Sequence, residues 1–174
     1  MHNSSRRGFM GKAFGAVAGV GVLASLVAMK KSWDPLPSVR AAGFTTLDMA
    51  IYKEGELVTE QWRGKPVFVL RKTAEMVAKQ TESQKKRDIA INGSHFMVAI
   101  GLCTHLGCIP AYKVAEEEFL CACHGGKFDW AGEVTLLPPP RALDIPPFKI
   151  EGNNMILGET GPEFKAMKDS GITL

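Results

Sequence analysis

Residues 103–129 read Cys103-Thr-His105-Leu-Gly-Cys108, then twelve intervening residues, then Cys121-Ala-Cys123-His124-Gly-Gly-Lys-Phe-Asp129. This stretch holds all four cysteines of the chain and two of its four histidines. Each of its two boxes brings a thiolate and an imidazole together on a short loop, so two such boxes can surround one metal centre. Two of the four cysteines are then not needed as ligands.

Three interpretations of these six residues remain open on the pattern alone. A structural zinc site would use four of them and leave two free thiols, which is unfavourable in an oxidising compartment, where thiols tend to pair. Two disulfides would use the cysteines and leave both histidines without a role. A two-iron, two-sulfide cluster with two cysteine and two histidine ligands, the other two cysteines being paired, uses all six residues.

The N-terminal part predicts export and attachment to a membrane. Ser5-Arg6-Arg7-Gly8-Phe9-Met10 is typical of a twin-arginine export signal, and the residues from Ala13 to Met29 carry no charge. As a helix, the apolar segment from Gly8 to Met29 spans roughly 33 Å, enough for a bilayer core. A cleaved signal peptide is the alternative, but no small-residue cleavage site follows the apolar run. We therefore predict a signal and a retained transmembrane anchor over residues 1–29.

Charge divides the chain into two parts. Up to Arg40, six basic residues and one acidic residue give a formal charge of +5, whereas the remaining 15 basic and 17 acidic residues give −2. Phosphate binding needs a concentrated basic face, so nucleic acid is not an expected partner of the near-neutral remainder. Residues 30–43 contain Pro35 and Pro37 and show no apolar periodicity, which indicates a flexible linker.

Residues 44–174 are predicted to fold as an all-β head. Short strands are expected at residues 56–61, 66–71, 96–102 and 133–136, and in a hairpin over 148–157 that turns at Gly152-Asn153. One helix is predicted over residues 73–87, with Thr73 as its N-cap. His95 is interpreted as a strand-edge histidine in preference to a third metal ligand. Residues 158–174 show no clear pattern.

The boxes Cys-Thr-His-Leu-Gly-Cys and Cys-x-Cys-His-Gly resemble those of Rieske iron-sulfur proteins, specifically the anchored subunit of cytochrome bc-type quinol-oxidising complexes. The resemblance also covers the anchor, the linker, the all-β head and the proline triplet Pro138–Pro140. It implies an antiparallel Rieske-type β head with a cluster-binding subdomain at about 101–141, on a single N-terminal transmembrane helix. It implies a 2Fe-2S cluster held by Cys103, His105, Cys121 and His124, with a disulfide between Cys108 and Cys123.

The resemblance further implies a function as the redox subunit of an oxidoreductase. An electron would pass from membrane quinol through the cluster to a c-type cytochrome, and His124 would accept a hydrogen bond and a proton from the quinol hydroxyl. The expected partners are a cytochrome b subunit, a c-type cytochrome subunit and quinol, in a dimeric complex of a bacterial inner membrane with the head on the periplasmic side. The alternative is the Rieske small subunit of an arsenite-oxidase-like molybdenum enzyme, which does not use quinol.

Two residues depart from the family pattern. High-potential members carry a serine where this chain has Gly126 and a tyrosine where it has Phe128, and those hydroxyls donate hydrogen bonds to cluster sulfide and cysteine sulfur. Without these donors the reduced, more negative cluster is less stable, so a lower potential is expected, which suits menaquinol. Leu106 is expected to face outward for docking. Residues 138–140 are expected to form a stiff wall over the cluster.

Overall fold

The structure, a computed structural model of the 174-residue chain, describes residues 6–37, 39 and 43–172. The chain divides into two compact units, Met1–Ala41 and Ala42–Leu174. Ser5 of the twin-arginine pattern and residues 38 and 40–42 of the predicted linker lie outside the described residues.

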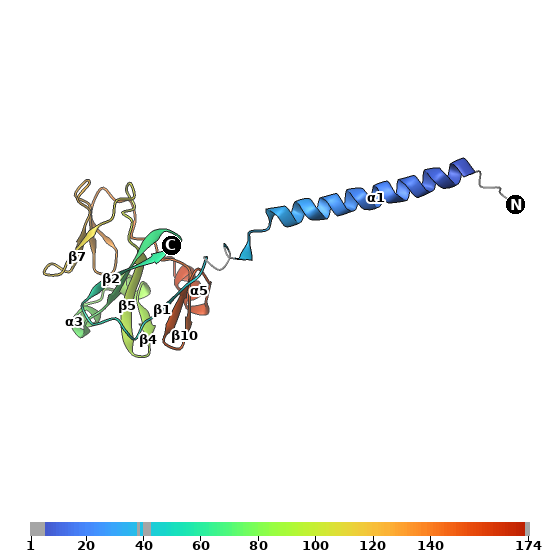
Figure 1. Cartoon of the computed structure of the whole chain (residues 1–174). Coiled ribbons are helices and arrows are strands. Elements are labelled where there is room, and N and C mark those ends of the chain that lie inside the picture. Colours follow the sequence, from blue (N-terminus) through green and yellow to red (C-terminus); the bar gives the residue numbers. More distant parts are fainter. Residues whose placement is uncertain (1–5, 38, 40–42, 173–174) are drawn as a thin grey trace. The chain divides into compact units, whose positions relative to one another are not determined.

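The first unit contains one long helix, α1 (Arg6–Trp33), drawn in blue in Figure 1. Its most apolar 18-residue window has a mean hydropathy of 1.8, and the helix is long and apolar enough to cross a membrane. The helix ends at Trp33, four residues beyond the predicted end at Met29, and its last turn contains Lys30 and Lys31. Cationic side chains are favourable there because the C-terminal end of a helix carries partial negative charge.

The second unit, which we call the head, contains three antiparallel sheets (Figure 1). The first has the order β1 (Thr45–Asp48), β11 (Asn154–Leu157), β10 (Phe148–Glu151). The second has the order β2 (Leu57–Trp62), β3 (Lys65–Arg71), β5 (Ser94–Ile100), β4 (Ile89–Ile91). The third has the order β6 (Ala111–Lys113), β7 (Glu118–Leu120), β8 (Lys127–Asp129), β9 (Val134–Leu136). The predicted all-β class of the head is confirmed.

The two central strands β3 and β5 have buried side chains on both faces. Because successive side chains of a strand point to opposite faces, each strand supplies two cores. Val67 and Val69 belong to a core shared with β10 and β11, whereas Phe68 and Leu70 belong to a second core shared with the third sheet. The ring of Phe68 stacks on Phe119 of β7, with centroids 5.2 Å apart. The third sheet is thereby packed onto the second.

The predicted single helix over residues 73–87 is wrong. The segment forms two short helices, α3 (Ala74–Ala78) and α4 (Glu82–Lys86). The side chain of Thr81 accepts a hydrogen bond from the backbone of Gln84, whose side chain accepts one from the backbone of Thr81. This capping box starts a new helix at a position where we had predicted a helix interior. The predicted N-cap Thr73 is confirmed.

The predicted hairpin over residues 148–157 is confirmed as β10 and β11, joined by the turn at Gly152-Asn153. The strand predicted over 96–102 begins and ends two residues earlier, as β5. Within the segment without a clear pattern, the structure contains helix α5 (Pro162–Asp169), which buries Phe164 and Met167. The ring of Phe164 meets that of Phe148 edge to face, so α5 packs against the first sheet.

Candidate metal centre

Two loops at one end of the third sheet share a hydrogen-bond pattern. In the first loop, the N–H of Cys103 donates to the carbonyl of Cys108 and the N–H of Gly107 donates to the carbonyl of Cys103. In the second loop, the N–H of Cys121 donates to the carbonyl of Gly126 and the N–H of Gly125 to that of Cys121. Gly107 and Gly125, at the same place in each loop, have φ of +80° and +73°, a conformation that glycine adopts without strain.

The pattern places the four predicted ligands close together in pairs. Cys103 and Cys121, the first residue of each loop, are free and buried, with exposed fractions of 4% and 2%, and their thiols are hydrogen-bonded. The Nδ1 atoms of His105 and His124 lie 3.2 Å apart, with the two rings edge to face. Each loop thus contributes one thiol to a buried pair and one imidazole to a more exposed pair.

The structure contains the predicted disulfide between Cys108 and Cys123, which joins the two loops. The sulfur atoms of Cys108, Cys121 and Cys123 lie within 4.8 Å of one another. This group of three is not an independent metal site, because two of its sulfurs are bonded to each other and offer no thiolate. The disulfide removes the objection that a metal centre here would leave two free thiols beside it.

The residues fit a 2Fe-2S cluster of the Rieske type. Burial raises the pKa of the Cys103 thiol, and the neighbouring Cys121 raises it further. A buried thiolate pair needs positive charge close by, which iron bound between Cys103 and Cys121 would supply. The donor set of two thiolates and two imidazoles matches the ligation in which histidines replace two cysteines on one of two irons.

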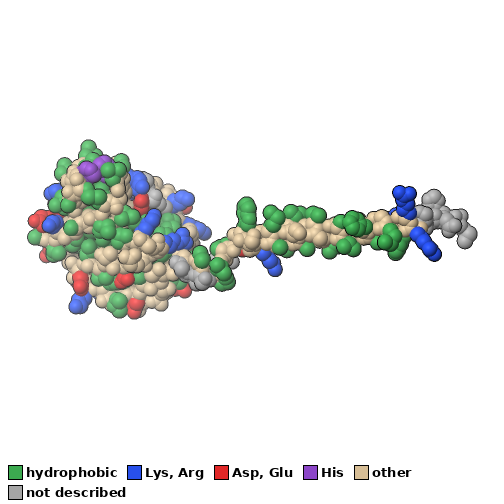
Figure 2. Space-filling view, turned by 45° about the horizontal axis from the view of Figure 1, so that its top comes forward, with side chains coloured by type: hydrophobic (Ala, Val, Ile, Leu, Met, Phe, Trp, Pro, Cys, Tyr) green, Lys and Arg blue, Asp and Glu red, His purple; other side chains and the backbone are tan. Residues whose placement is uncertain are grey.

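Hydrophobic side chains surround the histidines at this end of the head. Figure 2 shows histidine side chains reaching the surface beside hydrophobic ones. Leu106 of the first loop has an exposed fraction of 70% and Ile109 of 61%, and Leu137, just before the prolines, has 74%. Exposed apolar groups of this size, gathered at one site, are typical of a surface that docks onto a partner or a membrane-embedded site.

The two predicted potential-tuning positions are both buried. Phe128 lies in the middle of β8 opposite Phe119, with no exposed surface, in the same apolar core as Cys103 and Cys121. Gly126 ends the second loop and its side-chain position faces Pro139. Neither residue provides a hydroxyl.

The side chains of Lys72, Asp88 and His95 form a largely buried polar network that the sequence did not predict. The Nζ atom of Lys72, whose side chain has no exposed surface, lies 2.5 Å from Asp88, and the other Asp88 oxygen lies 2.5 Å from Nδ1 of His95. Burial would raise the pKa of the Asp88 carboxyl, but Lys72 and His95 together hold it below its usual range. The ammonium of Lys72 also lies over the ring of Trp130, which follows β8. His95, near the start of β5, is therefore a hydrogen-bond partner of Asp88.

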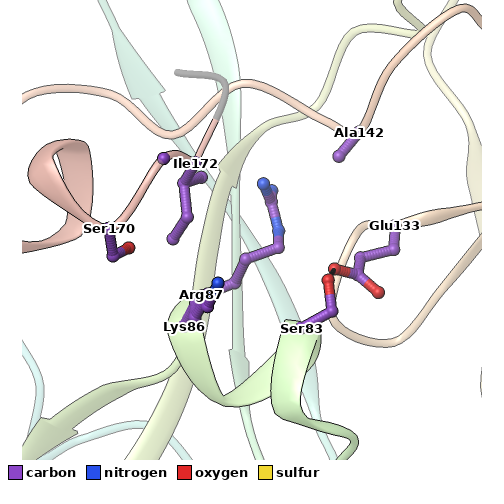
Figure 3. Close-up of a pocket in the computed structure, with 8 residues that line it drawn as sticks. Ser83, Lys86, Arg87, Glu133, Ala142, Ser170 and Ile172 are labelled. Carbon is purple, nitrogen blue, oxygen red and sulfur yellow. Dashed lines mark hydrogen bonds between the residues drawn. The ribbon is translucent and has the colours of Figure 1, made fainter.

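Arg87, which directly follows α4, is hydrogen-bonded to the segment of the head that follows β8. Its guanidinium donates hydrogen bonds to the carbonyls of Ala131, at 3.0 Å, and Leu143, at 2.6 Å. Figure 3 shows the side chain extending between Ile172 and Glu133, in a pocket of about 220 Å³. No cysteine or histidine lines this pocket, so it is separate from the metal centre.

Comparison with known proteins identifies relatives across most of the chain. Residues 46–149 match the family described as Rieske [2Fe-2S] domain. The "Ubiquinol-cytochrome c reductase iron-sulfur subunit" of Rhodospirillum rubrum is 32% identical over 167 residues, which cover 88% of this chain and 91% of that protein. The "Cytochrome b-c1 complex subunit Rieske, mitochondrial" of Schizosaccharomyces pombe is 31% identical, over 83% of this chain and 67% of that protein. A chain of the solved structure "Hyperthermophilic respiratory Complex III" matches with 31% identity and a TM-score of 0.60, over 83% of this chain and 98% of that one.

Proposed function

Because this chain belongs to the Rieske [2Fe-2S] domain family, we propose that it is the iron-sulfur subunit of a cytochrome bc1-type quinol–cytochrome c oxidoreductase. The observation that carries the proposal is the pair of disulfide-linked loops, each of which contributes one thiol to a neighbouring pair and one imidazole to another. The apolar helix α1 supports it further, because such a subunit needs a membrane anchor and α1 is long enough to be one.

In this proposal Cys103, His105, Cys121 and His124 are the ligands. When bound, the cluster supplies a one-electron acceptor, and two neutral imidazoles in place of thiolates place its potential at roughly −150 to +300 mV. The protein contributes the geometry: the hydrogen bonds within each loop fix the ligand backbones, and the Cys108–Cys123 disulfide holds the loops together. Burial of both thiols keeps water away from the sulfur side of the site.

His124 is the residue proposed to meet quinol. Its Nδ1 faces Nδ1 of His105, so its Nε2, on the opposite side of the ring, points away from the ligand pair. The side chain of His124 is exposed. If Nδ1 binds iron, a neutral His124 carries a hydrogen on Nε2, so Nε2 would accept a hydrogen bond from a quinol hydroxyl only in the deprotonated, imidazolate form. It would then take the hydroxyl proton, while one electron would pass from the same quinol to the cluster. Leu106, exposed beside it, would contact the quinol-binding surface of cytochrome b.

The proposed partners are a cytochrome b subunit and a c-type cytochrome. The helix α1 would anchor the subunit in the inner membrane, with the head on the periplasmic side. The linker predicted over residues 30–43, of which residues 30–33 belong to α1, would let the head move between partners. A Rieske subunit of an arsenite-oxidase-like enzyme is not favoured, because the relatives described above are named for quinol–cytochrome c reductases and respiratory complexes.

We further propose that the quinol is menaquinol. The supporting observation is the absence of a hydroxyl at positions 126 and 128, both buried beside the metal centre. Fewer hydrogen bonds to sulfur destabilise the reduced state and lower the potential, which suits a quinol that is itself strongly reducing. A redox titration of the full chain with its cluster tests this point. A midpoint in the upper part of the Rieske range would contradict the menaquinol proposal and leave the subunit assignment intact.

Purification of the intact complex from membranes tests the subunit assignment. An affinity tag at the C-terminus should recover cytochrome b and a c-type cytochrome together with this chain, and the preparation should reduce cytochrome c with quinol. Recovery of a molybdenum-containing subunit in their place would contradict the assignment.

A further inference from the structure

Glycine at position 126 is not required by the backbone. Gly125, the preceding residue, has a φ of +73°, which accounts for a glycine there. Gly126 is not among the described residues with positive φ, so an L-residue could adopt its backbone conformation without strain. Another feature must account for the missing side chain.

The ring of Pro139 occupies the side-chain position of Gly126. A β-carbon built on Gly126 would lie 2.5 Å from Cδ and 2.6 Å from Cγ of Pro139, well inside van der Waals contact, and the next heavy atom, Cδ of Pro138, would be 3.4 Å away. A proline ring cannot rotate out of the way as a flexible side chain can. Pro139 is also buried, so the backbone of one segment would have to move.

The segment carrying Pro139 is held on both sides. Before it, β9 pairs with β8. After it, the carbonyl of Arg141 accepts a hydrogen bond of 2.6 Å from Thr104 in the first loop, and the N–H of Leu143 donates to the carbonyl of Gly132. A displacement of Pro139 would therefore strain the first loop as well as the second.

We infer that Pro139 is a positioning residue of the metal centre: its ring, seated against Gly126, holds the second ligand loop in place and prevents any side chain at position 126 from reaching the site. For the cluster this inference rests on the proposed function. It links two features that the sequence presented separately, the glycine after the second box and the proline triplet. Pro139 therefore also excludes the hydroxyl that would raise the potential, because a serine at 126 cannot be accommodated while the ring is present.

Paired substitutions in the full chain test the contact. Gly126→Ala should reduce the folding equilibrium constant by about tenfold or more, the usual effect of overpacking. The same substitution in a Pro139→Ala background should cost much less, because that change removes the two ring atoms nearest the new β-carbon and keeps the rest of the residue. Pro140→Ala is the matched control, because it also removes a proline ring from the triplet but not one of the atoms nearest Gly126. An equal cost of Gly126→Ala in the Pro139→Ala and Pro140→Ala backgrounds, or no cost in the parent, would overturn the inference.

The redox potential provides a second readout that a purely structural contact would not change. In the Pro139→Ala background, Gly126→Ser should give a higher midpoint potential than Gly126→Ala, because the two variants differ only by a hydroxyl that can now reach the site. With Pro139 present, Gly126→Ser should lose cluster. If it retained the cluster and raised the potential equally, the inference would be wrong. The unfolding measurements on cluster-free protein test the contact even if the proposed function fails.

Discussion

Removal of the disulfide should destabilise the head by an amount that follows from the loop it closes. Cys108 and Cys123 are 15 residues apart in sequence. A cross-link of this span restricts the unfolded chain by about 3 kcal/mol. For a head of this size, Cys108→Ala combined with Cys123→Ala should therefore lower the melting temperature by roughly 10 °C.

Urea unfolding of the cluster-free chain is the appropriate assay, because loss of a bound cluster makes unfolding irreversible. Trp62 and Trp130 are both buried in the head, so tryptophan fluorescence follows its unfolding. Thiol reductant supplies the control: it should reproduce the loss in the parent chain and have no further effect on the double variant. A loss of unfolding free energy below about 1 kcal/mol would refute the reasoning, because it would show that the cross-link does not restrict the unfolded chain as its loop length requires.

Three other substitutions, two of them with a matched control, test further features of the head. Phe128→Tyr should raise the midpoint potential by about 60 mV or more. A hydrogen bond to a charged group contributes about 1.5 kcal/mol or more, and 59 mV corresponds to a tenfold change in the equilibrium constant for one electron. An unchanged potential would show that the new hydroxyl does not reach sulfur. Asp88→Asn should cost about 3 kcal/mol because it leaves buried Lys72 unpaired, whereas Glu82→Gln, which breaks an exposed ion pair, should cost less than about 1 kcal/mol. The pKa of Asp88 is held below its ordinary value of 3.8, so the parent chain should keep the stabilisation from the Lys72–Asp88 pair above pH 3.8 and lose it as the pH falls through the depressed pKa. An equally steep loss of stability in acid for Asp88→Asn would contradict this. Leu106→Ser should slow quinol oxidation in the complex, whereas Val114→Ser should not. Both residues are 70% exposed, but Val114 lies in the β6–β7 turn, at the other end of the hairpin from the ligand loops. Equal effects of the two substitutions would contradict a docking role for Leu106.

The sequence predicted those features that depend on local pattern. The spacing of Cys103, His105, Cys121 and His124 was informative because short loops with fixed hydrogen bonds place nearby residues reproducibly. The presence of α1 followed from an uncharged apolar run, although the helix extends beyond that run at both ends, and the β10–β11 hairpin followed from its turn residues.

Features that depend on tertiary contacts were not predicted. One local feature was also missed: Thr81-Glu82-Ser83-Gln84 is a capping-box pattern inside the segment predicted as one helix, and it separates α3 from α4. The ion pair of Lys72 with Asp88 joins residues 16 apart. The sequence led us to expect a wall over the cluster at residues 138–140, but it did not indicate that Pro139 would contact Gly126.

The central claim is that two thiolates and two imidazoles of this chain hold a 2Fe-2S cluster. Pulsed electron paramagnetic resonance of the reduced full chain tests it most directly, because coordinated nitrogen couples to the unpaired electron. The account predicts coupling to two imidazole nitrogens, reduced to one or lost with the cluster in His105→Ala and in His124→Ala, and unchanged in His95→Gln. A paramagnetic signal without nitrogen coupling, or no signal from protein that contains zinc, would contradict it.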